Sequence, residues 1–119
     1  MVGVYIMKKI MHIVQSPGGV ERYIQMFLKY INTEKYKNIL VCSGEYEQSY
    51  YEKYTSAFEY VDMVREINPL SDLKAILHVR KLIKKYKPDI IYCHSSKAGA
   101  IGRIADLGIR NKIIYNPHG

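Results

Sequence analysis

Three short polar turns follow apolar runs in this chain and contain residues able to bind an anion or a hydroxyl group. They are Ser16–Glu21 (SPGGVE), His94–Gly99 (HSSKAG) and Asn116–Gly119 (NPHG). Glycines let a backbone approach a ligand closely, and a helix start offers unpaired N–H groups to an anion. An imidazole can bond a hydroxyl or stabilise a phosphate. If the fold brings them together, these turns predict a site for a charged, hydroxyl-bearing ligand.

Each turn also has a purely structural interpretation, and the residues alone leave both open. The first can be an ordinary strand-to-helix turn, because it matches neither GxGxxG nor the GxxxxGK[ST] of a P-loop. In the second, Ser95 or Ser96 can cap a helix while Lys97 lies on the surface, which leaves His94 unexplained. His12 lies within an apolar run and His78 in a basic segment, so both are predicted to be structural.

The elements that must position these turns are short apolar runs rich in β-branched residues. They predict five strands: Ile10–Val14, Ile39–Cys42, Ile90–Cys93, Lys112–Tyr115 and, more weakly, Tyr60–Ile67. Their apolarity is continuous rather than alternating, which is typical of parallel strands that are covered on both faces. Helical periodicity between the strands predicts crossover helices, as in an α/β sheet.

Three helices are predicted, over Val20–Ile31, Ser71–Tyr86 and Ala98–Leu107. The second is expected to begin at Ser71 as its N-cap and to present one apolar stripe to the sheet. That stripe comprises Leu73, Ile76, Val79, Ile83 and Tyr86. The segment Glu45–Tyr60, dense in Tyr and Glu, is interpreted as a further helix with an aromatic stripe; a ligand-facing aromatic loop is the alternative.

Alternating strands and helices predict a Rossmann-like, three-layer α/β sandwich with a five-stranded parallel sheet in the order 3-2-1-4-5. That order places the turns after strands one, four and five at one edge of the sheet, where ligands of open α/β sheets bind. It also separates Cys42 from Cys93 by one strand, too far for a disulfide. Gly99 and Gly102 are expected to let the third helix lie close to the sheet.

Length and charge restrict the kinds of protein that this chain can be. Its 119 residues fit one domain, so residues 1–119 are treated as a single unit. No apolar run approaches the roughly 20 residues of a membrane span, and Lys8-Lys9 follows the apolar start instead of preceding it, so a cytoplasmic protein is expected. The two cysteines form no CxxC pair, which gives zinc or redox chemistry no support.

The net charge of +7 is concentrated in the second half of the chain. Between Lys74 and Lys112 there are ten Lys or Arg residues but only two acidic residues, Asp89 and Asp106. Such a face attracts nucleic acid, anionic lipid or phosphorylated small molecules, unless it is simply a solvated helix surface. The run Lys74–Lys87 raises the hypothesis of peripheral attachment to the inner face of an anionic membrane.

Three segments together resemble the N-terminal domain of family-4 glycosyltransferases of the GT-B fold, particularly bacterial members that build surface polysaccharides. They are GGVERYI, KPDIIYCHSSKAGAIGRIA and KIIYNPHG, in the same order as in the family and spanning nearly the whole chain. The resemblance implies retaining transfer of a sugar from a nucleotide-diphosphate donor to a hydroxyl acceptor, without a required metal or other cofactor. The reaction would occur between two Rossmann-like domains, and the N-terminal domain would mainly hold the acceptor.

The resemblance also assigns roles to particular positions. Gly18 and Gly19 would approach the donor diphosphate, and His118 would contact the transferred sugar near the reacting carbon. His94, Ser95, Ser96 and Lys97 would line the acceptor side. Arg103 would add positive charge to the cleft or simply face solvent.

The chain departs from the family pattern because the sequence ends at Gly119. The family's donor domain carries two Glu residues eight positions apart, and no such pair occurs among the eleven acidic residues here. We therefore expect a missing C-terminal donor-binding domain as the partner, no nucleic acid, and an inactive fragment. The alternatives are a noncatalytic module that docks a membrane or protein through its basic face, and a sugar-nucleotide 2-epimerase. The epimerase is disfavoured because it requires an acidic residue where His94-Ser95-Ser96 stands.

Overall fold

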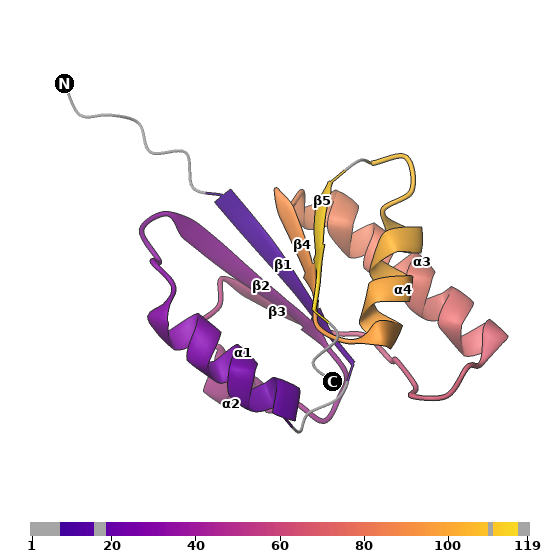
Figure 1. Ribbon diagram of the computed structural model, residues 1–119, viewed down its shortest axis with the longest axis horizontal. Helices are drawn as coiled ribbons and strands as arrows, with labels where there is room; N and C mark the ends of the chain where they lie inside the picture. The colour runs from indigo at the N-terminus through magenta and orange to yellow at the C-terminus, as the bar shows by residue number, and fades with distance from the viewer. Residues whose placement is uncertain (1–7, 16–18, 110, 117–119) are drawn as a thin grey trace.

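The computed structural model describes residues 8–15, 19–109 and 111–116, which build a five-stranded parallel sheet covered by helices (Figure 1). The strands are β1 (Lys8–Val14), β2 (Tyr36–Cys42), β3 (Ala57–Tyr60), β4 (Ile90–Cys93) and β5 (Lys112–Tyr115). Their order is β3-β2-β1-β4-β5, and every neighbouring pair is parallel. The predicted Rossmann-like α/β class and strand order are therefore confirmed.

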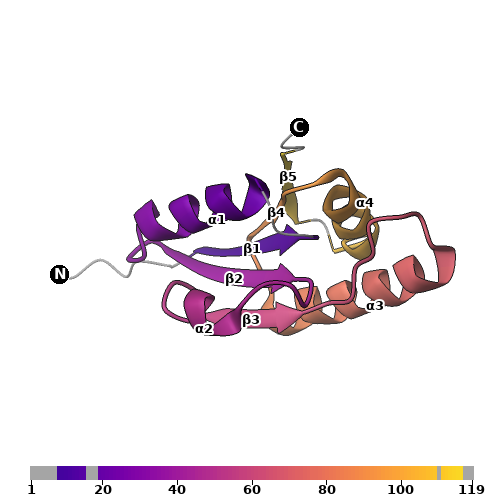
Figure 2. The same cartoon turned by 90° about the horizontal axis from the view of Figure 1, so that it is seen from below.

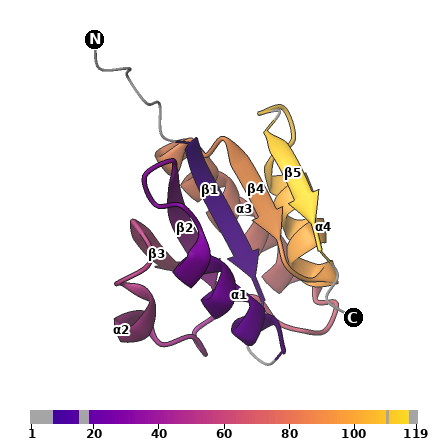
Figure 3. The same cartoon turned by 60° about the vertical axis from the view of Figure 1, so that its left-hand side comes forward.

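The helices cover both faces of the sheet. They are α1 (Gly19–Tyr30), α2 (Gln48–Tyr51), α3 (Pro69–Tyr86) and α4 (Ser96–Ala105). Figures 2 and 3 show the sheet lying between α1 on one side and α3 on the other. The arrangement follows from right-handed crossovers. The chain adds β2 and β3 on one side of β1 and then β4 and β5 on the other, and this change of direction moves the connecting helices from one face of the sheet to the other.

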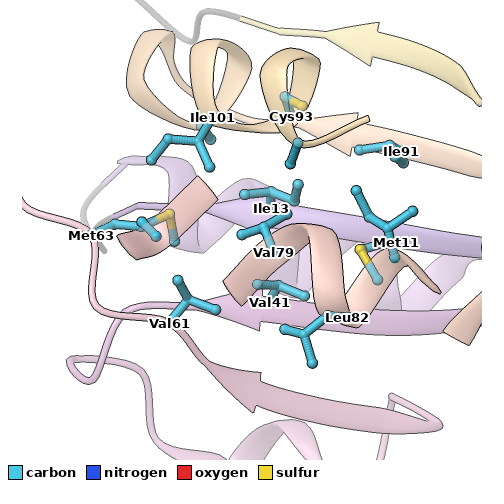
Figure 4. Close-up of a cluster of buried hydrophobic side chains, with 14 of the residues drawn as sticks. Met11, Ile13, Val41, Val61, Met63, Val79, Leu82, Ile91, Cys93 and Ile101 are labelled. Atoms are coloured by element: carbon cyan, nitrogen blue, oxygen red, sulfur yellow. The ribbon is translucent and has the colours of Figure 1, made fainter. Parts of the chain in front are cut away.

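Two apolar clusters, one on each face, hold the layers together. The larger joins the sheet to α3 and α4, and Figure 4 shows Ile13, Val41 and Cys93 of three strands pointing toward Val79 of α3 and Ile101 of α4. The smaller joins α1 and α2 to the other face of β1 and β2. Met11 and Ile13 of β1 belong to the larger cluster and Val14 to the smaller one, so both faces of this strand are covered, which explains the apolar residues on both of its sides.

Helix α3 begins earlier than predicted, and its predicted apolar stripe packs in the core except at its first residue. Asn68 rather than Ser71 is the N-cap, and its side chain accepts a hydrogen bond from the Ser71 backbone N–H at 3.1 Å. Pro69 occupies the first turn, where its missing N–H costs nothing. The predicted stripe residue Leu73 is 52% exposed, and Leu82 faces the core instead.

The prediction of a long helix over Glu45–Tyr60 is wrong, and so is the weak strand over Tyr60–Ile67. Only Gln48–Tyr51 is helical, and residues 57–60 form strand β3. These four residues pair with Ile39–Cys42, so β-pairing with a buried strand overrides the helical spacing of the aromatic residues. The rings of Tyr51 and Phe58 stack with their centroids 6.1 Å apart as part of the smaller apolar cluster.

Helix α4 lies unusually close to the sheet, as its glycines predict. A Cβ on Gly102 would lie 2.7 Å from the Cys93 sulfur, and one on Gly99 would lie 2.8 Å from the Tyr115 ring. Both distances are shorter than real Cβ contacts, so only glycine permits this approach. Cys42 and Cys93 are buried, free and separated by β1, as expected.

Candidate functional site

The ends of β1, β4 and β5 meet at one edge of the sheet, as the predicted site requires. Ile13 is in register with Cys93, and Cys93 with Tyr115, so the carboxyl ends of the three strands lie side by side. The Asn116 backbone N–H donates to the Cys93 carbonyl at 2.8 Å, which extends β5 to its turn. Gly19 begins α1 at the same edge. Gly18 and His118, the two other predicted ligand-contacting positions here, lie outside the described residues.

His94 is buried in a polar cluster between the sheet and α1. Its Nε2 atom lies 3.1 Å from Nδ1 of His12, and its ring stacks on Tyr92 with centroids 4.0 Å apart. His12 in turn lies 2.9 Å from the Asn38 side-chain oxygen through its own Nε2. Both histidines have no exposed surface. In this arrangement His94 connects β4 to β1 and β2 beneath the surface of the edge.

The protonation of this cluster follows from its geometry. An amide oxygen can only accept, so His12 carries its proton on Nε2 and Nδ1 accepts from His94. Burial lowers the pKa of His12 from 6.5 to about 4, and the hydrogen bond to Asn38 opposes this only in part. His12 is therefore neutral at physiological pH, which agrees with its predicted structural role.

The two serines of the second turn bond within the chain. Ser95 is the N-cap of α4 and accepts from the Ala98 backbone N–H at 3.1 Å, which confirms one of the capping alternatives. Ser96 shares a 3.1 Å hydrogen bond with the Tyr115 hydroxyl and remains exposed. Arg103, also exposed, lies over the ring of Tyr115 with its guanidinium carbon 5.3 Å from the centroid.

Lys97 ties the start of α4 to the start of α3. Its ammonium lies 2.6 Å from a carboxylate oxygen of Asp72 and donates to the Glu66 carbonyl at 2.7 Å. The bond from Lys97 is the main reason that the pKa of Asp72 is lowered. Much of the positive charge predicted at this turn is thus already compensated within the chain.

In the part of the chain that the structure describes, open space at this edge lies beside β1, β2 and β3. One cleft of about 420 Å³ is formed by the residues that follow these strands, and we call it the edge cleft. It is lined by Gln15, Ser43, Gly44, Glu45, Asp62, Met63, Val64, Arg65 and Glu66. Gln15 donates to the Met63 carbonyl at 3.3 Å, which ties two of its walls together.

A second cleft of about 530 Å³ adjoins the first and shares Gly44 and Glu45 with it. We call it the tyrosine cleft, and its lining comprises Glu21, Gln25, Gly44, Glu45, Tyr46, Glu47, Gln48, Tyr50, Tyr51 and Tyr60. Carboxylates and amides bond sugar hydroxyls, and tyrosine rings cover the apolar faces of sugars. Burial raises the pKa of Tyr51 to about 12, so its hydroxyl stays protonated.

Sequence reasoning did not select these cleft residues as ligand contacts. Two signals could have indicated them: Glu21 lies within the GGVERYI motif, and the alternative interpretation of the Tyr- and Glu-rich segment was a ligand-facing aromatic loop. Within the described ranges, no group of three or more His, Cys, Asp or Glu side chains could hold a metal ion. In the same part of the chain, no helix is both long and apolar enough to span a bilayer.

A doubly wound parallel sheet defines the Rossmann-like class, in which ligands bind at the carboxyl ends of the strands, and this chain has polar clefts there. Comparison with known proteins identifies the family. Residues 17–119 match Glycosyltransferase Family 4, and the chain belongs to that family.

A curated relative and a solved structure show that the chain is similar to part of larger proteins. It is 35% identical over 101 residues to the UDP-Gal:alpha-D-GlcNAc-diphosphoundecaprenol alpha-1,3-galactosyltransferase of Escherichia coli, covering 82% of this chain and 26% of that enzyme. A crystal structure of a glycosyltransferase from Rickettsia africae ESF-5 superimposes with a TM-score of 0.79 at 23% identity, covering 97% of this chain and 31% of that one. The chain therefore spans about a quarter to a third of these relatives.

A UDP-N-acetylglucosamine 2-epimerase has the same fold, with a TM-score of 0.67 at 13% identity, covering 92% of this chain and 33% of that one. Transferases and an epimerase thus share this architecture, and the fold alone does not separate the two activities. The matched family is a family of glycosyltransferases and the curated relative is a galactosyltransferase, so both comparisons support the transferase assignment.

Proposed function

We propose that this chain is the acceptor-side half of a retaining glycosyltransferase. The complete enzyme would move a sugar from a nucleotide-diphosphate donor to a hydroxyl of an acceptor in polysaccharide or glycolipid synthesis. The observation that carries the proposal is the family match over residues 17–119, a range that includes strands β2 to β5 and every residue of the two clefts except Gln15.

The clefts support an acceptor that presents several hydroxyl groups. Glu21, Gln25 and Glu45 offer carboxylate and amide groups around one opening, and tyrosine rings form its wall. The curated relative is named for transfer to a sugar on diphosphoundecaprenol. We propose the same class of acceptor here: a saccharide linked through diphosphate to a lipid.

The donor would bind mainly outside this chain. The paired glutamates of the family's donor domain do not occur in the sequence, and the chain covers only 26% of the curated relative. We propose that this chain alone neither turns over substrate nor binds a nucleotide sugar tightly, and that no resident cofactor takes part. Gly18 and Gly19 would approach the donor diphosphate once a donor-binding domain closes over the edge of the sheet.

A transfer assay tests the proposal. The chain is compared, alone and joined to a family donor-binding domain, for transfer of radiolabelled sugar from a nucleotide-diphosphate sugar to a lipid-diphosphate saccharide. We expect turnover only in the joined form. Turnover by the chain alone, or none in a correctly folded joined form with several donor sugars, would contradict it.

His118 separates this proposal from a noncatalytic binding module. Its imidazole would contact the transferred sugar, so His118→Ala in the joined form should abolish transfer while leaving the fold unchanged. The matched control is His78→Ala, an exposed histidine on α3 away from the edge. Equal activity of the two variants would remove the assignment of His118.

A further inference from the structure

The hydroxyl of Tyr92 contacts two of the segments that form the candidate site. Tyr92 belongs to β4, and its oxygen lies 2.8 Å from the hydroxyl oxygen of Tyr23 in α1. The side-chain nitrogen of Asn116 lies 3.5 Å from the same oxygen, at the outer limit of a hydrogen bond. A hydroxyl can donate and accept at the same time, so this one group connects α1 with the end of β5.

Both partners of Tyr92 lie near positions that the proposed function uses. Tyr23 is about one helical turn beyond Gly19, where α1 begins. Asn116 precedes His118 by two residues. Figure 3 shows β1 and β5 running toward the same end of the sheet, where α1 begins. Moving either partner would therefore move the backbone that carries one of these positions.

The ring of Tyr92 is held in place independently of its hydroxyl. It stacks on His94 with the centroids 4.0 Å apart and meets Phe27 of α1 edge-on, with the centroids 5.8 Å apart. The hydrogen bond to Tyr92 is the main reason that the pKa of Tyr23 is raised to about 12. The Tyr23 hydroxyl therefore stays protonated at physiological pH. The two hydroxyls form a neutral link that is attached to a firmly packed ring.

The clefts proposed for the acceptor are tied to α1 by a different bond. Gln25 of α1 donates to the Tyr51 hydroxyl at 3.3 Å, and both residues line the tyrosine cleft. Among the residues that the structure describes, the linings of the two clefts include neither Tyr23, Tyr92 nor Asn116. Loss of the Tyr92 hydroxyl would thus leave the acceptor side of α1 with its own attachment.

We propose that Tyr92 is a positioning residue for sugar transfer, whose hydroxyl fixes the start of α1 relative to the turn after β5. The inference rests on the proposed function and deepens it. In transfer, the bond from the anomeric carbon to the diphosphate oxygen breaks and that carbon bonds the acceptor oxygen. The proton of the acceptor hydroxyl passes to the departing diphosphate. Tyr92 takes no part in these bond changes and acts through Gly19 and His118, where a misplacement of about 1 Å can cost about a hundredfold in rate.

Kinetics of the joined form test the proposal, because a positioning role lowers kcat without weakening acceptor binding. Tyr92→Phe keeps the ring and its stacking and removes only the hydroxyl. We expect kcat to fall by roughly tenfold or more while KM for the acceptor stays unchanged. Tyr23→Phe should have the same effect. The double variant should be no slower than either single variant, because both remove the same bond.

The matched control is Tyr86→Phe on α3, which also loses one hydroxyl hydrogen bond, to Glu59. Tyr86 lies beside the start of β1, at the other edge of the sheet, so its variant should keep the kcat of the unchanged joined form. Equal losses of kcat in the Tyr92 and Tyr86 variants would overturn the inference. So would an unchanged kcat in Tyr92→Phe, or a rise in its KM for the acceptor as large as its loss of kcat. The proposed function would stand in each case.

An NMR measurement on the 119-residue chain does not depend on transfer. Tyr92→Phe should shift the amide signals of Val20 and Asn116 and leave that of Gly44, which lines both clefts, in place. Tyr86→Phe should shift none of the three. Unmoved signals of Val20 and Asn116 would overturn the inference by themselves. Absence of transfer by the unchanged joined form contradicts the proposed function instead, so the two failures are distinguishable.

Discussion

Acidification should destabilise the fold through the buried pair of His12 and His94. Neutral His12 donates from Nε2 to Asn38 and accepts at Nδ1 from His94. A proton added at Nδ1 would face the proton of His94 and place a charge where no water reaches it. The surrounding side chains, Phe27 and Tyr92, contribute aromatic rings and offer no carboxylate to balance that charge.

The pKa of His12 sets the size and sign of this effect. Burial lowers it from 6.5 to about 4 in the folded chain. Because the unfolded chain binds the proton more readily, the stability from His12 is fully present above about pH 6.5 and is lost progressively as the pH falls to about 4. Between about pH 7.5 and about pH 5 the loss is about 2 kcal/mol. A domain of this size is typically stable by only about 5–15 kcal/mol.

Urea unfolding at these two pH values measures the effect, and NMR of the imidazole protons assigns it. We expect a lower unfolding midpoint at the lower pH and a His12 signal that does not titrate near 6.5. The carboxylate of Asp72, whose pKa is lowered, loses its contribution only below its ordinary value of 3.8 and does not interfere. A stability that is flat over this interval, or an imidazole that titrates normally, would refute the reasoning.

Three further predictions follow from packing and pairing. Gly102→Ala should lower the free energy of unfolding by about 1–2 kcal/mol, because its Cβ would lie 2.7 Å from Cys93 Sγ. Gly44→Ala, with nothing within 4 Å of the added Cβ, is the control in the same urea experiment and should be nearly neutral. Lys97→Met should lower stability, and Asp72→Asn should add little in that background, which a double-mutant cycle measures. Both cysteines should resist a thiol reagent until the chain unfolds, since burial raises each thiol pKa to about 12; fast labelling of the folded chain would contradict this.

The central strands were predictable because their burial in the sheet is visible in the sequence as continuous apolar runs. In the runs from Ile10 and Ile39 every residue except His12 is apolar, because these strands are buried on both faces of the sheet, and this same feature made the strand order predictable. The run from Ile90 is apolar as well, although only Ile91 and Cys93 are buried. The edge strand β5 was predicted with its bounds, Lys112–Tyr115, but the other edge strand, β3, was not predictable in this way. Residues 57–60 are only half-buried, and their strand depends on pairing with β2, which the local sequence does not encode.

The turns of the candidate site were predictable in position but not in what their side chains bind. Topology placed Gly19, His94 and Asn116 at one edge, as the structure has them. The sequence could not reveal that Lys97 reaches Asp72, because the pairing depends on how α3 lies beside α4. Nor could it reveal that His94 points inward to His12, since that depends on which face of β4 packs under α1.

The central claim is that the clefts beside β1, β2 and β3 hold a sugar acceptor. An NMR titration of the chain with a soluble short-chain lipid-diphosphate saccharide, with a nucleotide-diphosphate sugar as the comparison ligand, tests it most directly. We predict that the acceptor shifts the amide signals of Glu21, Glu45 and Tyr50, and that the donor causes no comparable shift at the same concentration. Saturable shifts from the donor with none from the acceptor would show that the chain does not serve as the acceptor half.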